Sequence, residues 1–478
     1  MPGATLSEDD RAAQPRHLHS SVTPTRSKGA AVTTRESIPR EPAAQQPVRS
    51  AQRDLDPHLH RYAQRTEGMT ASEIRALFAV ASRPEVVSLA GGMPYLPVLP
   101  LDSLADELAQ VVAIDGMTAL QYGSAQGTEE LREQICEVMA LEGVRGHADD
   151  VTVTVGSQMA LDMVTRIFCD PGDVVLAEAP SYVGALTTFA SYQAQVMHVQ
   201  MDDDGLVPSA LEAALRSLHA EGRAAKFLYT IPTFHNPAGV TLAVPRRAEI
   251  LEVCARYGLL IIEDNPYGLL GFDGQTYPAL RAYESDNVIY LGSFSKTFAP
   301  GLRVGWALAP HAVREKLVLA AETATLCPPA FTQALVSRYL SQHDWKGQIK
   351  NYQEAYRDRR DAMVAALHQY LPPGCRWTHP AGGFYVWLTV PDGLDTKAML
   401  PRAVSQRVAY VPGTAFYADS LGSRQMRLSF CYPTPERITE GVRRLATVLD
   451  GELERHRTFG SVSPRVVHGP QSPSPDTA

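Results

Sequence analysis

The chain has 478 residues, more than a single core of ~100–200 residues usually needs, so we expect more than one packed unit. Hydrophobic residues make up 45% of it and charged residues 20%, an ordinary globular composition that excludes a mostly disordered or collagen-like chain. The net charge of −8 gives no basic surface for nucleic acid or anionic lipid, and no apolar run is long enough to span a bilayer. We therefore expect neither a nucleic-acid partner nor a membrane partner.

The six cysteines lie far apart and form no C-x-x-C pair. Disulfide frameworks belong mainly to short secreted chains, so we expect reduced thiols and a cytoplasmic location. Two His-Leu-His triplets, at 17–19 and 58–60, are interpreted as solvated residues of a tail rather than as metal ligands. The sequence therefore predicts no metal site.

Both ends of the chain have the composition of disordered tails. Residues 1–58 contain no Phe, Trp or Tyr and many prolines, so they offer too little apolar surface to offset the entropy cost of ordering. This segment has no apolar region typical of a secretory signal, and its acidic run Glu8-Asp9-Asp10 argues against a transit peptide. Residues 456–478 are again rich in proline and predict a second tail.

Between these tails, short runs rich in Val, Ile and Leu alternate with helical patterns from about residue 150 onward. Nearly continuous apolar runs are typical of strands covered on both faces, and Pro245–Tyr257 has the pattern of a helix with proline in its first turn. Strand, crossover helix and strand again predict a mainly parallel, doubly wound α/β sheet. The expected strands are 151–155, 173–178, 226–230, 259–262, 288–291 and 304–308.

The pattern changes after about residue 330, where long helical segments at 331–370 and 434–455 enclose shorter β-like runs at 383–388 and 426–431. This stretch predicts a second, smaller α+β domain. The expected parts are a disordered N-terminal extension, a first segment of the small domain, the large domain, the rest of the small domain and a disordered tail, at 1–58, 59–105, 106–330, 331–455 and 456–478.

Polar residues follow four of the expected strands, and ligands of open α/β sheets bind beyond the carboxyl ends of strands. The strand at 151–155 leads to Gly156-Ser157-Gln158 and a helix start, where free backbone N–H groups favour an anion. Each of these segments alone also fits an ordinary cap, turn or surface charge. The other three strands lead to His235-Asn236-Pro237-Ala238-Gly239, Glu263-Asp264-Asn265-Pro266-Tyr267 and Gly292-Ser293-Phe294-Ser295-Lys296, with Arg303 shortly after.

Together the four strand ends supply what pyridoxal phosphate needs. Its aldehyde requires an amine for a Schiff base, and its ring nitrogen requires a carboxylate to stay protonated and act as an electron sink. Its phenolate oxygen requires hydrogen-bond donors, and its phosphate requires a helix N-terminus, hydroxyls and a cation. The combination predicts this cofactor.

From roughly Met69 to Leu449 the chain resembles the fold-type I pyridoxal-phosphate aminotransferases of class I/II, and most closely their 2-aminoadipate, kynurenine and aromatic transaminase subgroup. The matching motifs, in the order typical of the family, are Leu89-Ala90-Gly91-Gly92-Met93-Pro94, Gln121-Tyr122-Gly123, Gly156-Ser157-Gln158, Asn236-Pro237-Ala238-Gly239, Asp264-Asn265-Pro266-Tyr267, Ser293-Phe294-Ser295-Lys296 and Arg427-Leu428-Ser429-Phe430.

The resemblance implies catalytic roles for three residues. Lys296 would form the Schiff base and shuttle the proton, and Asp264 would pair with the ring nitrogen. Tyr267 would bind the phenolate oxygen together with Asn236, which is also expected to contact the substrate.

The resemblance also implies how the phosphate and the ring are held. Ser157 and Gln158, largely through backbone N–H groups, would bind the phosphate together with Ser293 and Arg303. Tyr122 resembles a tyrosine that reaches the phosphate of the neighbouring subunit. The aromatic that stacks on the ring corresponds to Tyr182.

For the substrate, the resemblance implies that Arg427 clamps the α-carboxylate with help from the Gly92 backbone. Arg75 stands where the subgroup has an arginine on a mobile helix that meets acidic side chains. A solvated helix face explains Arg75 equally well. Met159 and His235 stand where glutamine is frequent in the family, and neither occupies a required role.

The activity implied is an aminotransferase that moves an amino group between an L-amino acid and a 2-oxo acid, as a homodimer with shared active sites. Two alternatives stay open on the sequence. The same cofactor could serve elimination, replacement, oxidation or carbon–carbon bond formation in specialised biosynthesis. A transcriptional regulator could carry an aminotransferase-like sensing domain, although residues 1–58 lack the periodic apolar helices of a winged helix-turn-helix. The sequence does not name the amino donor or acceptor.

Overall fold

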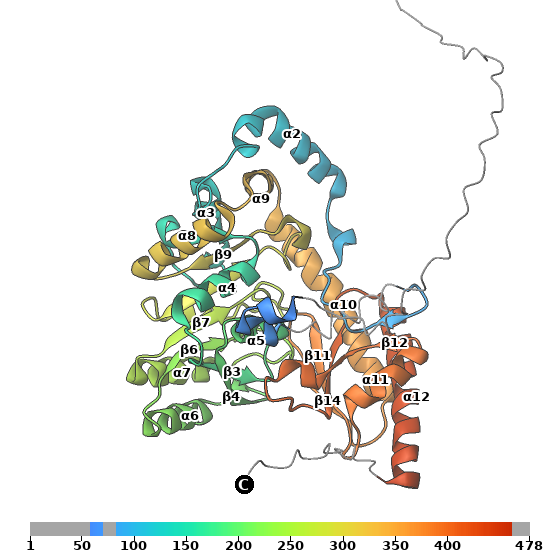
Figure 1. Cartoon of the computed structure of the whole chain (residues 1–478). Helices are drawn as coiled ribbons and strands as arrows, with labels where there is room; N and C mark the ends of the chain where they lie inside the picture. Colours follow the sequence, from blue (N-terminus) through green and yellow to red (C-terminus); the bar gives the residue numbers. More distant parts are fainter. Residues whose placement is uncertain (1–57, 70–82, 461–478) are drawn as a thin grey trace, which may run out of the picture. The chain divides into compact units, whose positions relative to one another are not determined.

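Figure 1 shows the computed structural model of the chain, which describes residues 58–69 and 83–460. The chain divides into two units between Arg61 and Tyr62, and the fold below belongs to the second unit. Arg75 and most of the two predicted tails lie outside the described residues. The last helix, α12 (Pro435–Phe459), continues into the segment predicted as the second tail, so residues 456–459 are helical.

An eight-stranded sheet forms the centre of the fold, in the order β2-β9-β8-β7-β6-β3-β4-β5. Five adjacent strands, β8, β7, β6, β3 and β4, pair in parallel, whereas β9 runs antiparallel to both of its neighbours. The mainly parallel sheet predicted from the sequence is confirmed. The strands are β2 (Val151–Thr154), β3 (Val174–Ala179), β4 (Gln195–Asp202), β5 (Gly205–Leu206), β6 (Ala225–Thr230), β7 (Leu260–Asp264), β8 (Val288–Ser293) and β9 (Gly305–Leu308).

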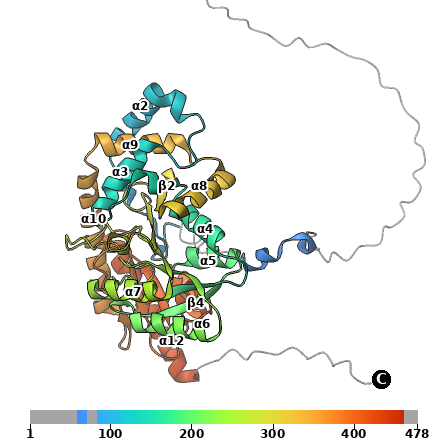
Figure 2. The ribbon, with the colours of Figure 1, turned by 90° about the vertical axis from the view of Figure 1, so that its left-hand side faces the viewer.

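Helices cover both faces of this sheet, as a doubly wound topology requires. One apolar core joins the sheet to α4, α5 and α8, and a second core joins its other face to α6 and α7. In Figure 2, α6 and α7 lie together and apart from α4 and α5. The helices are α4 (Ser157–Phe168), α5 (Val183–Ser191), α6 (Pro208–Ala220), α7 (Val244–Tyr257) and α8 (His311–Thr325).

Local sequence explains the bounds of these elements. Helix α7 has proline in its first turn and ends at Gly258, whose φ of 60° lies in the left-handed region that glycine adopts without strain. Strand β8, which was predicted from a continuous apolar run, is buried along its whole length. Strand β4 was not predicted, because its sequence alternates polar and apolar residues and its side chains are largely exposed or half-buried.

A four-stranded sheet, in the order β10-β11-β14-β13, packs with long helices in the C-terminal part of the chain. The two-residue strand β1 pairs in parallel with β12, which joins the segment near residue 87 to this C-terminal part. The C-terminal strands and helices are β10 (Arg376–Trp377), β11 (Tyr385–Thr389), β12 (Val408–Ala409), β13 (Val411–Pro412), β14 (Gln425–Ser429), α9 (Ala330–Gln342), α10 (Trp345–Tyr370), α11 (Thr396–Ser405) and α12.

The second, smaller α+β region agrees with the sequence prediction, and we keep the boundaries near residues 105 and 330 as a proposal. Before the first sheet the chain forms β1 (Val87–Ser88), α2 (Leu101–Ala119) and α3 (Glu129–Ala140). No helix in residues 58–69 and 83–460 combines the length and the apolar character needed to cross a bilayer. Short 3₁₀ helices occur at Leu59–Arg61, Gln64–Gly68, Leu96–Val98, Ala148–Asp150, Leu280–Ala282, Pro300–Leu302 and Gly413–Phe416.

Candidate active site

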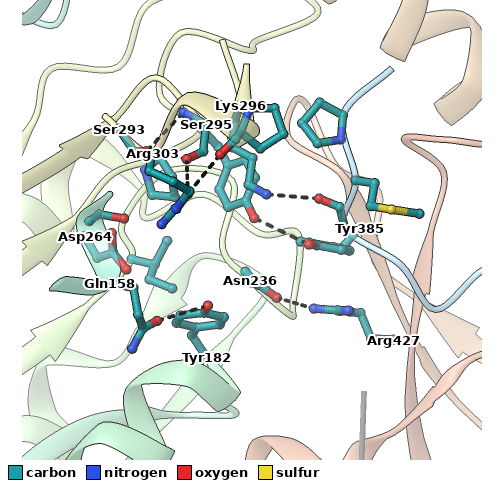
Figure 3. Close-up of a pocket in the computed structure, with 18 residues that line it drawn as sticks. Gln158, Tyr182, Asn236, Asp264, Ser293, Ser295, Lys296, Arg303, Tyr385 and Arg427 are labelled. Atoms are coloured by element: carbon teal, nitrogen blue, oxygen red, sulfur yellow. Dashed lines mark hydrogen bonds between the residues drawn. The ribbon is translucent and has the colours of Figure 1, made fainter. Parts of the chain in front are cut away.

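A cavity of about 340 Å³ lies where several strands of the large sheet end (Figure 3). Side chains from the ends of β6, β7 and β8 meet there with residues that begin α4 and with residues of the four-stranded sheet. The cavity is lined by Gly92, Met93, Pro94, Ser157, Gln158, Tyr182, Ile231, Asn236, Asp264, Pro266, Tyr267, Ser293, Ser295, Lys296, Pro300, Arg303, Tyr385 and Arg427.

Lys296 follows β8 and is the one lysine among the described residues that lines the cavity. Its Nζ donates to the backbone carbonyl of Gly92 at 3.0 Å. Burial, the largest cause, lowers the pKa of Lys296 to about 8, because the low-dielectric surroundings disfavour an ammonium ion. At pH 7 about a tenth of this amine is therefore unprotonated and able to act as a nucleophile, far more than for an ordinary lysine.

Asp264 is the last residue of β7, and its side chain is buried. Its Oδ2 accepts a hydrogen bond of 2.7 Å from the hydroxyl of Tyr229, while its buried Oδ1 has no partner among the described residues. Burial raises the pKa of Asp264 to about 6, and the hydrogen bond from Tyr229 opposes this shift. A buried carboxylate oxygen without a partner fits a bound cation or a protonated ring nitrogen, which is what pyridoxal phosphate would place there.

The start of α4 and the turn after β8 form a cradle for an anion. Gly156, with φ of 76°, precedes α4, and a Cβ at this position would collide with the guanidinium of Arg303. This glycine therefore lets the arginine approach the free N–H groups of the helix start. Arg303 also donates to Ser295 Oγ at 3.3 Å, and Ser295 Oγ accepts from Ser293 Oγ at 2.8 Å. Two hydroxyls, a cation and a helix N-terminus suit a phosphate.

Tyr182 and Gln158 lie against each other on one side of the cavity (Figure 3). The Tyr182 hydroxyl donates to Gln158 Oε1 at 3.3 Å, and Gln158 Nε2 donates to Thr188 Oγ1 at 2.8 Å. Burial raises the pKa of Tyr182 to about 12, so its phenol stays protonated. Because the Gln158 side chain is engaged with these partners, its backbone N–H is the group left to meet a phosphate.

Arg427, in β14, is buried and held on several sides. Its Nη1 donates to Asn236 Oδ1 at 2.9 Å, and its Nη2 donates to the Ala90 carbonyl at 2.8 Å. The guanidinium carbon lies 4.1 Å from the ring centre of Tyr385 and 5.1 Å from that of Phe416. A planar guanidinium fixed in this way presents its remaining donors to a carboxylate in one geometry.

Tyr267 and Tyr385 both line the cavity, and their hydroxyl oxygens are 3.5 Å apart. Burial raises the pKa of Tyr267 well above its ordinary value, so the hydroxyl is a hydrogen-bond donor at neutral pH. A Cβ at Gly92 would collide with the Tyr385 hydroxyl, so this position favours glycine. The backbone carbonyl of the same glycine accepts the hydrogen bond from Lys296.

Of the residues predicted for the site, the cavity brings together Lys296, Asp264, Tyr267, Asn236, Ser157, Gln158, Tyr182, Ser293, Arg303, Arg427 and Gly92. Tyr122 is 76% exposed and is not among the described residues that line it. Arg75 lies outside the described residues.

Three polar residues at the site were not predicted. Ser295 stands two residues after Ser293, in the turn that follows β8, where its hydroxyl accepts a hydrogen bond from that of Ser293. Tyr229 and Tyr385 lie in strands and read as ordinary core aromatics.

The aminotransferase class I and II family matches residues 84–445. Aromatic-amino-acid aminotransferase 1 of Thermococcus litoralis is 41% identical over 397 residues, which cover 82% of this chain and 95% of that protein.

Two solved structures extend the match to the fold and to the cofactor. Kynurenine aminotransferase of Pyrococcus horikoshii, in complex with PMP, has a TM-score of 0.80 at 38% identity and covers 84% of this chain and 99% of its own. The α-aminoadipate aminotransferase of Thermus thermophilus, complexed with N-(5'-phosphopyridoxyl)-L-leucine, has a TM-score of 0.77 at 36% identity, over 83% and 99% of the two chains. The chain belongs to the class I and II aminotransferases and is a transaminase that depends on pyridoxal phosphate.

Proposed function

We propose that this cavity is the transamination site and that the place of each residue in it determines which part of the cofactor or substrate it binds. Lys296 would hold the cofactor covalently, Asp264 would bind its ring nitrogen, and Asn236 and Tyr267 would bind its phenolate oxygen. Ser293, Ser295 and Arg303 would hold the phosphate at the start of α4, and Tyr182 would pack against the ring. The single observation that carries this proposal is the convergence of these groups in one cavity, with Asp264 Oδ1 buried and unpartnered in the described structure.

When bound, pyridoxal phosphate supplies an electron sink for the electrons left at the substrate Cα after proton loss. Lys296 is placed to remove that proton and to return it, since its lowered pKa leaves part of the amine unprotonated near neutral pH. Asp264 keeps the ring nitrogen protonated by presenting a negative charge in a buried site. Arg427 orients the amino acid by its α-carboxylate.

The substrates are an amino acid and a 2-oxo acid, as for other aminotransferases. We propose that the amino donor belongs to the range named for the relatives, namely aromatic amino acids, kynurenine or 2-aminoadipate. A screen of the purified holoenzyme with these donors, against 2-oxoglutarate and pyruvate, tests the proposal. Oxo-acid formation that requires an acceptor supports transamination, whereas sustained turnover without an acceptor would show a different reaction.

The role of Asp264 has its own test. Asp264→Asn keeps the shape of the side chain and removes the charge, so the chemical step should slow by at least ~100-fold, on the order of 2.7 kcal/mol. Cofactor affinity should fall less, because the phosphate contacts remain. Wild-type turnover in this variant would remove Asp264 from the ring nitrogen.

We further propose that two copies of the chain form a homodimer with shared active sites. Helix α2, which packs against α9, carries several exposed apolar side chains, among them Val112, Ile114 and Met117, of which Met117 is 93% exposed. Such a surface favours burial against a partner. Tyr122 follows this helix, is exposed, and is not among the described residues that line the cavity of its own chain. It would therefore contribute to the cavity of the second copy.

The cytoplasmic location stays a prediction from the sequence. Immunoblotting of cell fractions with an antibody to this chain tests it.

A further inference from the structure

The carboxylate of Asp264 is held by a residue that the roles above do not use. Tyr229 lies in β6, which pairs in parallel with β7, the strand that ends at Asp264. Its side chain is fully buried, and its hydroxyl donates to Asp264 Oδ2 at 2.7 Å. The ring packs edge-on against Phe189, with centroids 5.6 Å apart, and this close packing restricts its movement away from Asp264.

This hydrogen bond runs in one direction only. Burial and the nearby Asp264 charge raise the pKa of Tyr229 well above its ordinary value, so the phenol keeps its proton and acts as the donor. A donor on Oδ2 favours the ionised carboxylate and fixes its rotation. The other oxygen, Oδ1, is buried without a partner among the described residues, and Asp264 lines the cavity.

We propose that Tyr229 is a positioning residue that keeps the Asp264 carboxylate ionised and leaves its second oxygen free for the ring nitrogen of the cofactor. The inference rests on the proposed role of Asp264. A carboxylate and a ring nitrogen that share one proton divide it according to their relative basicity. Loss of the Tyr229 hydroxyl makes the carboxylate more basic, so the shared proton moves from the ring nitrogen toward Asp264, and the ring becomes a weaker electron sink.

The chain offers a matched control one strand away from Asp264. Tyr290, in β8, is also buried and donates to a buried carboxylate, Glu142 Oε2, at the same distance of 2.7 Å. Neither Tyr290 nor Glu142 lines the cavity within the described structure. Tyr229→Phe and Tyr290→Phe therefore remove equivalent hydroxyls, and both leave a buried carboxylate with one donor fewer.

The experiment compares the two variants with the wild-type holoenzyme loaded with cofactor that carries ¹⁵N at the ring nitrogen. In Tyr229→Phe we expect the ¹⁵N signal to move toward that of an unprotonated pyridine and kcat to fall by about 10- to 100-fold, the size of one hydrogen bond to a charged group. In Tyr290→Phe the ¹⁵N signal and kcat should match the wild type. Unfolding temperatures identify losses due to stability alone.

A wild-type ¹⁵N signal in Tyr229→Phe, or equal changes in both variants, would overturn the inference. Should Tyr229→Phe not fold, Tyr229→Met removes the same hydroxyl with a flexible side chain that fills the gap. Asp264→Asn separates the two proposals. If that variant keeps wild-type turnover, the role of Asp264 itself fails, whereas an inactive Asp264→Asn beside an unaffected Tyr229→Phe overturns only the role of Tyr229.

Discussion

Arg427 is the side chain on which substrate orientation depends, and Arg427→Lys tests it. Arginine presents a planar pair of donors to a carboxylate, whereas lysine presents one compact charge. In the structure the guanidinium is fixed by Asn236 Oδ1 at 2.9 Å, by the Ala90 carbonyl at 2.8 Å and by the ring of Tyr385 at 4.1 Å. Lysine keeps the charge and loses this fixed fork.

The expected loss is that of one hydrogen bond between charged groups, ~1.5–3 kcal/mol. At about 1.4 kcal/mol for each factor of ten, kcat/KM for an amino acid should fall by about 10- to 150-fold. Most of the change should be in KM, because the substrate carboxylate is bound in both the ground state and the transition state. Cofactor affinity should stay close to the wild-type value.

The assay compares an aromatic amino acid with the matched amine that lacks the α-carboxylate, using the rate of change in cofactor absorbance in single turnovers. The variant should be impaired with the amino acid and equal to the wild type with the amine. Arg424→Lys is the matched control, since Arg424 precedes the same strand and donates to the Val390 carbonyl outside the cavity. Equal losses with both substrates, or an unchanged KM for the amino acid, would refute the role of Arg427.

Two further predictions concern the subunit interface and the buried lysine. Tyr122→Phe should weaken cofactor affinity by about 10- to 150-fold, the effect of losing one hydrogen bond to a charged group. Mixing inactive Lys296→Ala and Tyr122→Ala proteins under subunit exchange should restore part of the activity. A fully active monomer in sedimentation would contradict the shared active site. Because burial lowers the pKa of Lys296 from 10.5 to about 8, the apoprotein carries a penalty that is fully present below pH 8 and disappears as the pH rises toward 10.5. Lys296→Met apoprotein should therefore gain about 3 kcal/mol of stability over wild type at pH 7 relative to pH 10.5, as measured by chemical unfolding at the two pH values. The exposed Lys316→Met should change stability by less than ~0.5 kcal/mol at either pH; no gain in Lys296→Met would contradict the prediction.

The central sheet was predictable because its inner strands are covered on both faces. Continuous apolar runs such as 288–291, separated by helical patterns, indicate buried strands of a parallel sheet. Strand β4 was not predicted, because it lies near the edge of the sheet and its residues alternate in polarity. Such a pattern is equally typical of a loop and of a surface strand. Helix α12 extends past residue 455 because the tail was assigned from composition, which does not mark where a helix ends.

For the site, the strand ends were predictable because ligand groups in a parallel sheet gather at one edge. Tyr385, which lines the cavity from within β11, and Tyr229, which donates to Asp264 from within β6, were not predicted. Tyr385 and Tyr229 look like core aromatics in the sequence, and only their partners, Arg427 and Asp264, distinguish them from residues that merely fill space. Residue spacing also carries no information about a second subunit, so the assignment of Tyr122 came from the family resemblance alone and stays a prediction.

The attachment of the cofactor to Lys296 is the most direct test of the proposed mechanism. The holoenzyme is treated with borohydride, digested and analysed by mass spectrometry for a peptide that carries the phosphopyridoxyl group. The expected result is that this mass lies on Lys296 and that Lys296→Ala yields no modified peptide while it still binds the cofactor reversibly. A modified peptide that contains any other lysine would contradict it.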